Sequence, residues 1–374
     1  MKKINDDSRL LSLDVLRGLD LMMLVGLQPL LRVFLVELDN PLLNGTLLYQ
    51  FDHAQWEGMR VWDFVMPLFL FMSGVTMPYS LPKYRTRNGD MKVWARVLKR
   101  FFVLFALGML VQGNVLALDL DRVYLYSNTL QAIAVGYLFT VPLVLYLKPW
   151  QQVVAIAVLL LVYSVPMHLW GDWSAQGNFA CIVDKAILGR FRDGSVIAPD
   201  GTVLFAAWYD YTWIWSSITF CCTVTLGSLA GHVTKNGNND RPATARRLLL
   251  IGLMLLIAGL LSGILQPIIK RIWTASMVLY SAGWCYLLLA LFYWWIDVKG
   301  HRKGWNWLLF YGCNAITAYI VGEVVNFRCI ASSLFYGLEQ YIGEWYPVFL
   351  TACNSLILFL LLWLMYGNKF FLQV

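Results

Sequence analysis

FDHAQWEGMRVWDFVMPLFLFMSG, residues 51–74, is the stretch that decides the fold and first points to a site. Its second half is an apolar run that predicts the start of a membrane helix. Its first half carries five ionisable residues within twelve positions, namely Asp52, His53, Glu57, Arg60 and Asp63. Charged groups are costly in lipid and usually serve a water-filled path or a partner when they occur near it. The stretch therefore predicts a membrane entry point with a polar function at its rim.

The composition of the whole chain agrees with a membrane protein. It is 59% hydrophobic and 14% charged, with a mean hydropathy of +0.61, whereas soluble domains carry about 25% charged residues. The 17 Trp and 19 Tyr suit aromatic belts at the two membrane interfaces. We predict an all-α polytopic membrane protein, a single transmembrane domain over residues 1–374. The apolar runs predict ten spans, at 12–36, 59–81, 98–118, 127–147, 151–169, 212–233, 247–267, 275–297, 305–326 and 346–367.

The loops between these spans predict an orientation. One set, formed by both termini and 82–100, 148–150, 234–247 and 298–304, holds nineteen Lys and Arg, and the opposite set holds eight. The positive-inside rule then places both termini in the cytoplasm. The same rule explains the net charge of +7, so a nucleic-acid partner is not needed to account for it. We also find no nucleic-acid-binding motif. The first residues, MKKINDDSRLLSLDVLRG, do not have the pattern of a cleaved signal peptide.

The first predicted span has a polar side. At about 100° per residue, Asp14, Arg17, Asp20, Gln28 and Arg32 fall within a stripe about 120° wide. Snorkelling explains the two ends of the stripe, but it does not explain Gln28. We interpret the stripe as the wall of a polar cavity.

His53 is the one histidine inside a charged cluster. A neutral imidazole near pH 7 serves as a general base or a nucleophile, and Asp63 is close enough in sequence to orient it. We interpret His168, His232 and His301 as interfacial or solvated residues. The seven cysteines show no metal spacing and are mainly packing residues; a pairing of the two loop cysteines, Cys181 and Cys329, is left open.

Several motifs resemble one protein family. RLLSLDVLRGLDLMMLV (9–25) and HAQWEGMRVWDFVMPLFLFMSG (53–74) are similar to the transmembrane acyltransferases that include heparan-α-glucosaminide N-acetyltransferase. The resemblance continues through SNTLQAIAVGYL (127–138), the stretch from KRIWTAS (270–276) to 300, and GCNAITAYIVGE (312–323), so it covers nearly the whole chain. It implies a bacterial relative in the inner membrane. The activity it implies is transfer of an acetyl group from cytoplasmic acetyl-CoA to an amino sugar or other glycan on the far side.

The resemblance also assigns residues. His53 occupies the family's active position, Asp63 is its aspartate, and Asp14 and Arg17 match the first motif. Gln28 stands where the family has asparagine. Glu57 replaces another motif asparagine, the loop before His53 is longer, and Tyr209–Thr212 replaces a family DPEG. These departures from the family pattern bear on the identity of the acceptor more than on the acetyl transfer itself.

The chemistry of the implied donor, acetyl-CoA, indicates further binding residues. Acetyl-CoA is strongly anionic, so Arg17 and Arg100 are candidates for its nucleotide, with the pantetheine arm along the polar stripe. Lys270 and Arg271 fall on the acceptor side of the predicted topology. Gln131 and Asn314 are amides inside spans that bind the arm, stabilise an oxyanion, or only bond to neighbouring helices.

Alternatives remain at this point. His53 either carries the acetyl group or deprotonates the acceptor. A secondary transporter of a small polar or anionic solute is the main rival function, and a structural scaffold is a third. The acceptor and the oligomeric state, with a homodimer as one option, are not determined by the sequence.

Overall fold

The structure is a computed structural model that describes residues 10–84, 90–237 and 239–372. Five of the basic residues behind the predicted orientation, Lys2, Lys3, Arg9, Arg85 and Arg87, lie outside this part of the chain. The helices of eight or more residues are α1 (Leu11–Met22), α2 (Gln28–Leu38), α5 (Val65–Val75), α7 (Met91–Gln112), α8 (Thr129–Tyr146), α9 (Pro149–Leu169), α10 (Phe179–Leu188), α11 (Ser217–Asn236), α12 (Arg241–Gly263), α13 (Ala275–Phe292), α14 (Asn306–Cys313), α15 (Ala315–Val324), α16 (Arg328–Phe335) and α18 (Tyr346–Gly367). Shorter helices are α3 (Pro41–Leu43), α4 (Tyr49–Phe51), α6 (Met77–Ser80) and α17 (Glu339–Ile342), and the only strands in the described residues are β1 (Ser195–Ile197) and β2 (Val203–Phe205).

The predicted fold class is confirmed. Eight helical stretches of the described residues are long and apolar enough to cross a membrane, and α14 with α15 would form a ninth if that bent pair is one span. The remaining predicted span, 98–118, is not among these stretches. It overlaps α7, whose N-terminal half carries four basic residues, namely Lys92, Arg96, Lys99 and Arg100. Helices dominate because lipid offers no partner to unpaired backbone groups. The protein is therefore a polytopic, mostly helical membrane protein.

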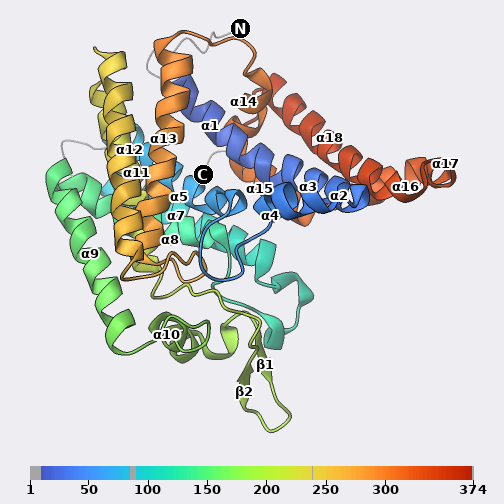
Figure 1. The fold of residues 1–374 in the computed structure, drawn as a ribbon, viewed down its shortest axis with the longest axis horizontal. Coiled ribbons are helices and arrows are strands. Elements are labelled where there is room, and N and C mark those ends of the chain that lie inside the picture. The colour runs from blue at the N-terminus through green and yellow to red at the C-terminus, as the bar shows by residue number, and fades with distance from the viewer. Residues whose placement is uncertain (1–9, 85–89, 238, 373–374) are drawn as a thin grey trace.

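The helices form two groups joined near α1 (Figure 1). Helices α11, α12 and α13 pack along one side, while α2 and α18 extend together to the other. The loop 170–211, with α10 and the antiparallel hairpin β1–β2, lies at the end opposite the N-terminus. This loop forms a cap on one end of the bundle.

Glycines allow the central helices to touch. A β-carbon at Gly18 of α1 would overlap the carbonyl of Leu308 in α14, and one at Gly312 would overlap the carbonyl of Asp14. Gly74 and Gly227 make the same close approach between α5 and α11. Small residues at such crossings are the usual means of close helix packing in membranes. They hold α1, α5 and α14 in fixed positions around the site.

The first span is not a regular α-helix. A π-helical turn, Met23–Leu27, separates α1 from α2 and changes the rotation per residue. Asp20 is buried beside Cys285, and Gln28 Nε2 donates to the carbonyl of Phe51 at 3.0 Å. The π-helical turn does not by itself remove the predicted polar stripe, which stays a prediction; of its residues, Arg17 lines a cavity described below.

The cysteines remain free. All seven lie in the described residues without a disulfide. Cys181 is buried in α10, whereas Cys329 is exposed in α16. The Cys181–Cys329 pairing left open by the sequence is not formed, and neither residue is in a loop.

Candidate active site

His53 and Asp63 form a hydrogen-bonded dyad at the start of the second span. His53 Nδ1 lies 2.7 Å from Asp63 Oδ1. The other oxygen, Oδ2, accepts the backbone N–H groups of Ala54 and Arg60, both at 3.0 Å. The Asp63 carboxylate therefore holds the backbone at both ends of the HAQWEG turn and also fixes the orientation of the imidazole ring.

The turn also joins a distant segment to the dyad. Gly58 has φ +93°, a conformation that glycine adopts readily. Its N–H donates to the carbonyl of Ile268 at 2.8 Å, and Trp56 Nε1 donates to the carbonyl of Trp173 at 2.7 Å. The first bond docks the turn on the segment between α12 and α13, and so brings Lys270 to the dyad, while the second docks the turn on the loop 170–211.

Lys270 completes a buried charged cluster. Its Nζ lies 3.2 Å from Asp63 Oδ1 and 3.1 Å from His53 Nδ1. An ionised carboxylate only accepts hydrogen bonds, so Nδ1 carries the proton and donates it to Asp63. The contact between Lys270 and Nδ1 is then a close approach of two donors, and the hydrogen bond of Lys270 goes to Asp63. This arrangement leaves the lone pair of His53 on Nε2.

The environment favours the neutral imidazole. Burial lowers the pKa of His53 from its usual 6.5; the hydrogen bond and charge of Asp63 oppose this, while the positive charges of Lys270 and Arg271 add to it. Burial also lowers the pKa of Lys270, and Asp63 opposes that shift. The side chain of His53 is still 41% exposed. It is therefore accessible and mainly uncharged at pH 7, as a base or nucleophile requires.

Arg271 links the dyad to the cap. Its guanidinium forms an ion pair with Asp210, donates to the carbonyl of Ala54 at 3.4 Å, and lies 5.5 Å from the centre of the Tyr211 ring. The Thr212 N–H donates to the Arg271 carbonyl at 3.1 Å. The predicted departure from the family at Tyr209–Thr212 thus lies beside His53.

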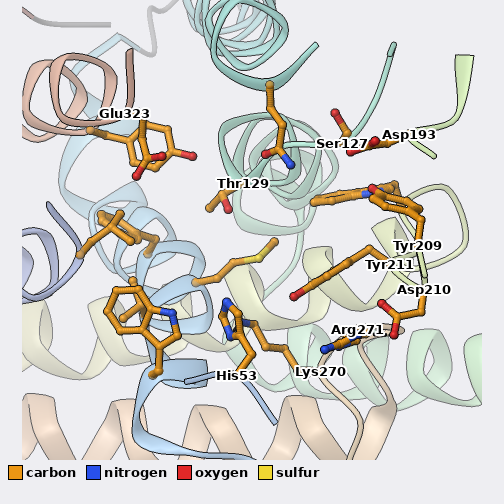
Figure 2. Close-up of a pocket in the computed structure, with 18 of the residues that line it drawn as sticks. His53, Ser127, Thr129, Asp193, Tyr209, Asp210, Tyr211, Lys270, Arg271 and Glu323 are labelled. Atoms are coloured by element: carbon orange, nitrogen blue, oxygen red, sulfur yellow. Dashed lines mark hydrogen bonds and ion pairs between the residues drawn. The ribbon is translucent and has the colours of Figure 1, made fainter. Parts of the chain in front are cut away.

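These groups surround a cavity of about 390 Å³ (Figure 2). His53, Lys270 and Arg271 line one side of it, and Asp193 and Glu323 lie across it. Aromatic side chains of the cap complete the wall, namely Trp208, Tyr209, Tyr211 and Trp213. Two cations therefore line the His53 side of the cavity, each paired with a carboxylate, and two further carboxyl groups lie opposite.

A second cavity, of about 330 Å³, is lined by arginines. Arg17 comes from α1, and Arg96 and Arg100 come from α7. The buried Nε of Arg100 has no hydrogen-bond partner among the described residues, and its guanidinium lies 4.3 Å from the centre of the Tyr137 ring. The two arginines predicted to bind the nucleotide therefore face the same cavity, which suits phosphate groups.

The remaining predicted residues do not line either cavity. Asp14 lies 3.8 Å from Arg17 and so supports it. Gln131 caps α8, since its Oε1 accepts from Ser127 and Asn128 and its Nε2 donates to Leu125. Asn314 stands at the junction of α14 and α15, and its buried Oδ1 has no partner among the described residues.

Some residues of the two cavities were missed from the sequence. Arg96 lies four residues before Arg100 and hence on the same helix face, so spacing would have found it. Asp193, Glu323 and Tyr211 gave no comparable signal because they come from three separate segments. The other histidines, all described, lie elsewhere; for example, His301 stacks on Trp295 with ring centres 4.4 Å apart.

Lys270 should control the acidic limb of the pH–rate profile. The folded-state pKa of His53 is lowered, so we expect kcat/KM to fall only below about pH 6.5. Lys270→Gln removes a positive charge that lowers this pKa, so the limb should move to higher pH. The measurement is kcat/KM between pH 5 and 8 for the acetyl transfer that the motifs predict. Lys185→Gln, whose Nζ bonds Gln176 in the cap, is the control; a limb unchanged or lowered in Lys270→Gln would contradict the prediction.

Comparison with known proteins agrees with the motifs. Residues 9–177, which include the dyad, match the family model "Heparan-alpha-glucosaminide N-acetyltransferase, catalytic". The chain is 24% identical to the heparan-alpha-glucosaminide N-acetyltransferase of Mus musculus over 85% of this chain and 54% of that protein. The protein of that name from Homo sapiens is 25% identical over 84% and 53%. The chain spans about half the length of these curated relatives, and the predicted resemblance is confirmed as a distant homology.

Proposed function

From this homology to the catalytic domain of heparan-α-glucosaminide N-acetyltransferases, we propose that the protein is a membrane acetyltransferase that uses acetyl-CoA. His53 is its reacting group, and the acceptor is an amino sugar or another glycan. The observation that carries the proposal is the His53–Asp63–Lys270 cluster, which opens into a cavity next to an arginine-lined one.

The arginine-lined cavity is the donor site in this proposal. Arg17, Arg96 and Arg100 offer three positive charges, and the phosphates of CoA are strongly anionic. The buried, unsatisfied Nε of half-buried Arg100 fits a missing anionic partner. Arg17 and Arg100 belong to the side that the loop charges predict to be cytoplasmic, so cytoplasmic acetyl-CoA is the expected donor.

Two chemical routes fit the geometry. In the first, His53 Nε2 attacks the thioester carbonyl carbon, the C–S bond breaks, CoA leaves as a thiolate that takes a proton, and an acceptor amine or hydroxyl then attacks the acetyl-imidazole. In the second, Nε2 takes the acceptor proton during direct attack on the thioester and passes it to the leaving thiolate. Asp63 holds the Nδ1 proton and stabilises the imidazolium in the second route.

The two cations beside His53 have a role in either route. Lys270 Nζ lies 3.1 Å from Nδ1 of the imidazole and Arg271 lines the same cavity, so both are near the place where the carbonyl oxygen becomes negative in the tetrahedral transition state. They also disfavour a protonated amine at this place. We infer that the acceptor reacts as a neutral amine or a hydroxyl.

The cap is the acceptor side of the proposal. Trp208, Tyr209 and Tyr211 offer aromatic faces to the cavity, and Asp193 and Glu323 offer hydrogen-bond acceptors. Aromatic faces with carboxylates suit a sugar ring and its hydroxyl groups. This composition supports a glycan acceptor over an apolar one.

Transfer across sealed membranes tests both the activity and its orientation. Inside-out vesicles loaded with glucosamine and given radioactive acetyl-CoA outside should accumulate labelled N-acetylglucosamine inside, while vesicles with His53→Ala should not. Absence of transfer in vesicles and in detergent would contradict the proposed acetyltransferase. Transfer in right-side-out vesicles alone would reverse the orientation and leave the activity standing.

One observation favours the rival transporter. The pair α14–α15 is bent by 79° at Asn314, and broken helices with polar groups at the break are common in transporters. A transporter would move its solute intact and would release no CoA. Release of free CoA thiol that depends on the acceptor therefore separates the two functions.

A further inference from the structure

The two cavities share one wall. Phe69 of α5, Thr129 of α8 and Tyr319 of α15 line both of them, and we call these three residues the neck. The arginines stand on one side of the neck, and His53 stands on the other. A donor whose phosphates bind the arginines and whose thioester reaches His53 must have its thin arm at the neck.

Helix α15 extends along this route. Ala315 and Ile316 face the arginine-lined cavity, Tyr319 forms the neck, and Glu323 faces the His53 cavity. Ile316, Tyr319 and Glu323 follow one another at spacings of three and four, and so lie on one helix face. The helix begins directly after the 79° bend at Asn314.

The neck is polar and held in place. Tyr319, 9% exposed, accepts a hydrogen bond from Asn128 Nδ2 at 3.1 Å, and the same nitrogen donates to Gln112 Oε1 at 3.2 Å. Ser127, 2% exposed, lines the His53 cavity beside it, and its hydroxyl has no partner among the described residues. A buried hydroxyl without a partner indicates a missing ligand group or water.

We propose that Tyr319 and Ser127 bind the amide groups of the donor's pantetheine arm and so position the thioester at His53. This inference rests on the proposed function. It gives the arm a different route from the one predicted along the first span. Tyr319 supplies a phenolic hydroxyl that accepts from Asn128 Nδ2; its own hydrogen, which donates to Asn128 Oδ1 at the long distance of 3.5 Å, turns to the amide carbonyl of the arm when the donor binds. Ser127 supplies a second hydroxyl, which the protein leaves unused.

The test removes each partner of this contact in turn. Three acetyl donors are compared: acetyl-CoA, acetyl-pantetheine without the phosphates, and S-acetyl-2-mercaptoethanol, which has no amide. One neutral hydrogen bond corresponds to roughly a fivefold change. We expect Tyr319→Phe and Ser127→Ala each to lower kcat/KM about fivefold for the first two donors and to leave the third unchanged. Tyr311→Phe, a buried tyrosine of α14 that lines neither cavity, is the control.

An equal loss with all three donors would show that Tyr319 and Ser127 are structural, and no loss with any would show that the arm lies elsewhere; either result overturns the inference. If the wild-type protein acetylates with none of the donors, the proposed function has failed. Calorimetric binding of CoA then tests the neck separately, because Tyr319→Phe and Ser127→Ala should each still raise the Kd about fivefold, and unchanged values would overturn the inference.

Discussion

His53→Ala is expected to reduce acetyl transfer by at least about a thousandfold, roughly 4 kcal/mol in barrier. The alanine has no atom to accept the acceptor proton or to carry the acetyl group. His53→Asn should be equally inactive, because an amide does neither. Removing a catalytic base or nucleophile costs several orders of magnitude in rate in well-studied enzymes of other families. The measurement is turnover of acetyl-CoA with glucosamine as acceptor.

The variant should still fold, since Asp63 keeps its bonds to Ala54, Arg60 and Lys270 without the imidazole. Binding of CoA should be unchanged because the arginines lie in the other cavity. His168→Ala is the matched control, as its ring packs edge-on against Trp173 near the cap, with ring centres 5.0 Å apart. Retention of more than about a tenth of wild-type turnover, a loss below about 1.4 kcal/mol, would show that His53 is not catalytic.

Asp63→Asn should act differently from His53→Ala within the same experiment. The imidazole keeps its chemistry but loses the carboxylate that fixes its tautomer, so part of the rate remains. Lys270, with a side chain only 8% exposed, also loses its counter-charge. Breaking a buried pair on one side costs about 3–5 kcal/mol of stability, so this variant should denature at a lower temperature than His53→Ala.

Neutralising the arginine-lined cavity is expected to weaken CoA binding strongly. Hydrogen bonds to charged groups contribute about 1.5–3 kcal/mol each, so Arg17→Gln and Arg100→Gln should each raise the Kd for CoA by roughly ten- to a hundredfold. The effect should shrink at high salt because it is electrostatic. Calorimetry with CoA in detergent measures both quantities.

The donor series provides an internal control. Acetyl-pantetheine lacks the phosphates, so its kcat/KM should change little in Arg100→Gln. Lys99→Gln is the matched variant on the same helix, since Lys99 is exposed and does not line the cavity. If Lys99→Gln weakens CoA binding as much as Arg100→Gln, the effect is one of general surface charge, and the arginine-lined cavity is not the donor site.

Local patterns in the sequence were sufficient for the class of fold and for the dyad. Apolar runs of about twenty residues predict helices in any membrane protein, because lipid leaves the backbone no other choice. His53 and Asp63 are only ten residues apart, and a single tight turn between them brings their side chains together. Arg17 and Arg100 were predicted because the resemblance implies an anionic donor, which requires cations, and their role at the donor stays a prediction.

The tertiary structure decided what distant segments do together. Lys270 reaches the dyad from 207 residues beyond Asp63, through backbone pairing at Gly58 that no local pattern indicates. The first span contains a π-helical turn, and an inserted residue of this kind leaves no mark on an apolar stretch such as MLVGL. The neck needs three helices to meet, and one of them begins at the bend at Asn314. Composition and periodicity record the environment of each helix, whereas the contacts between helices depend on packing, and packing is a property of the whole chain.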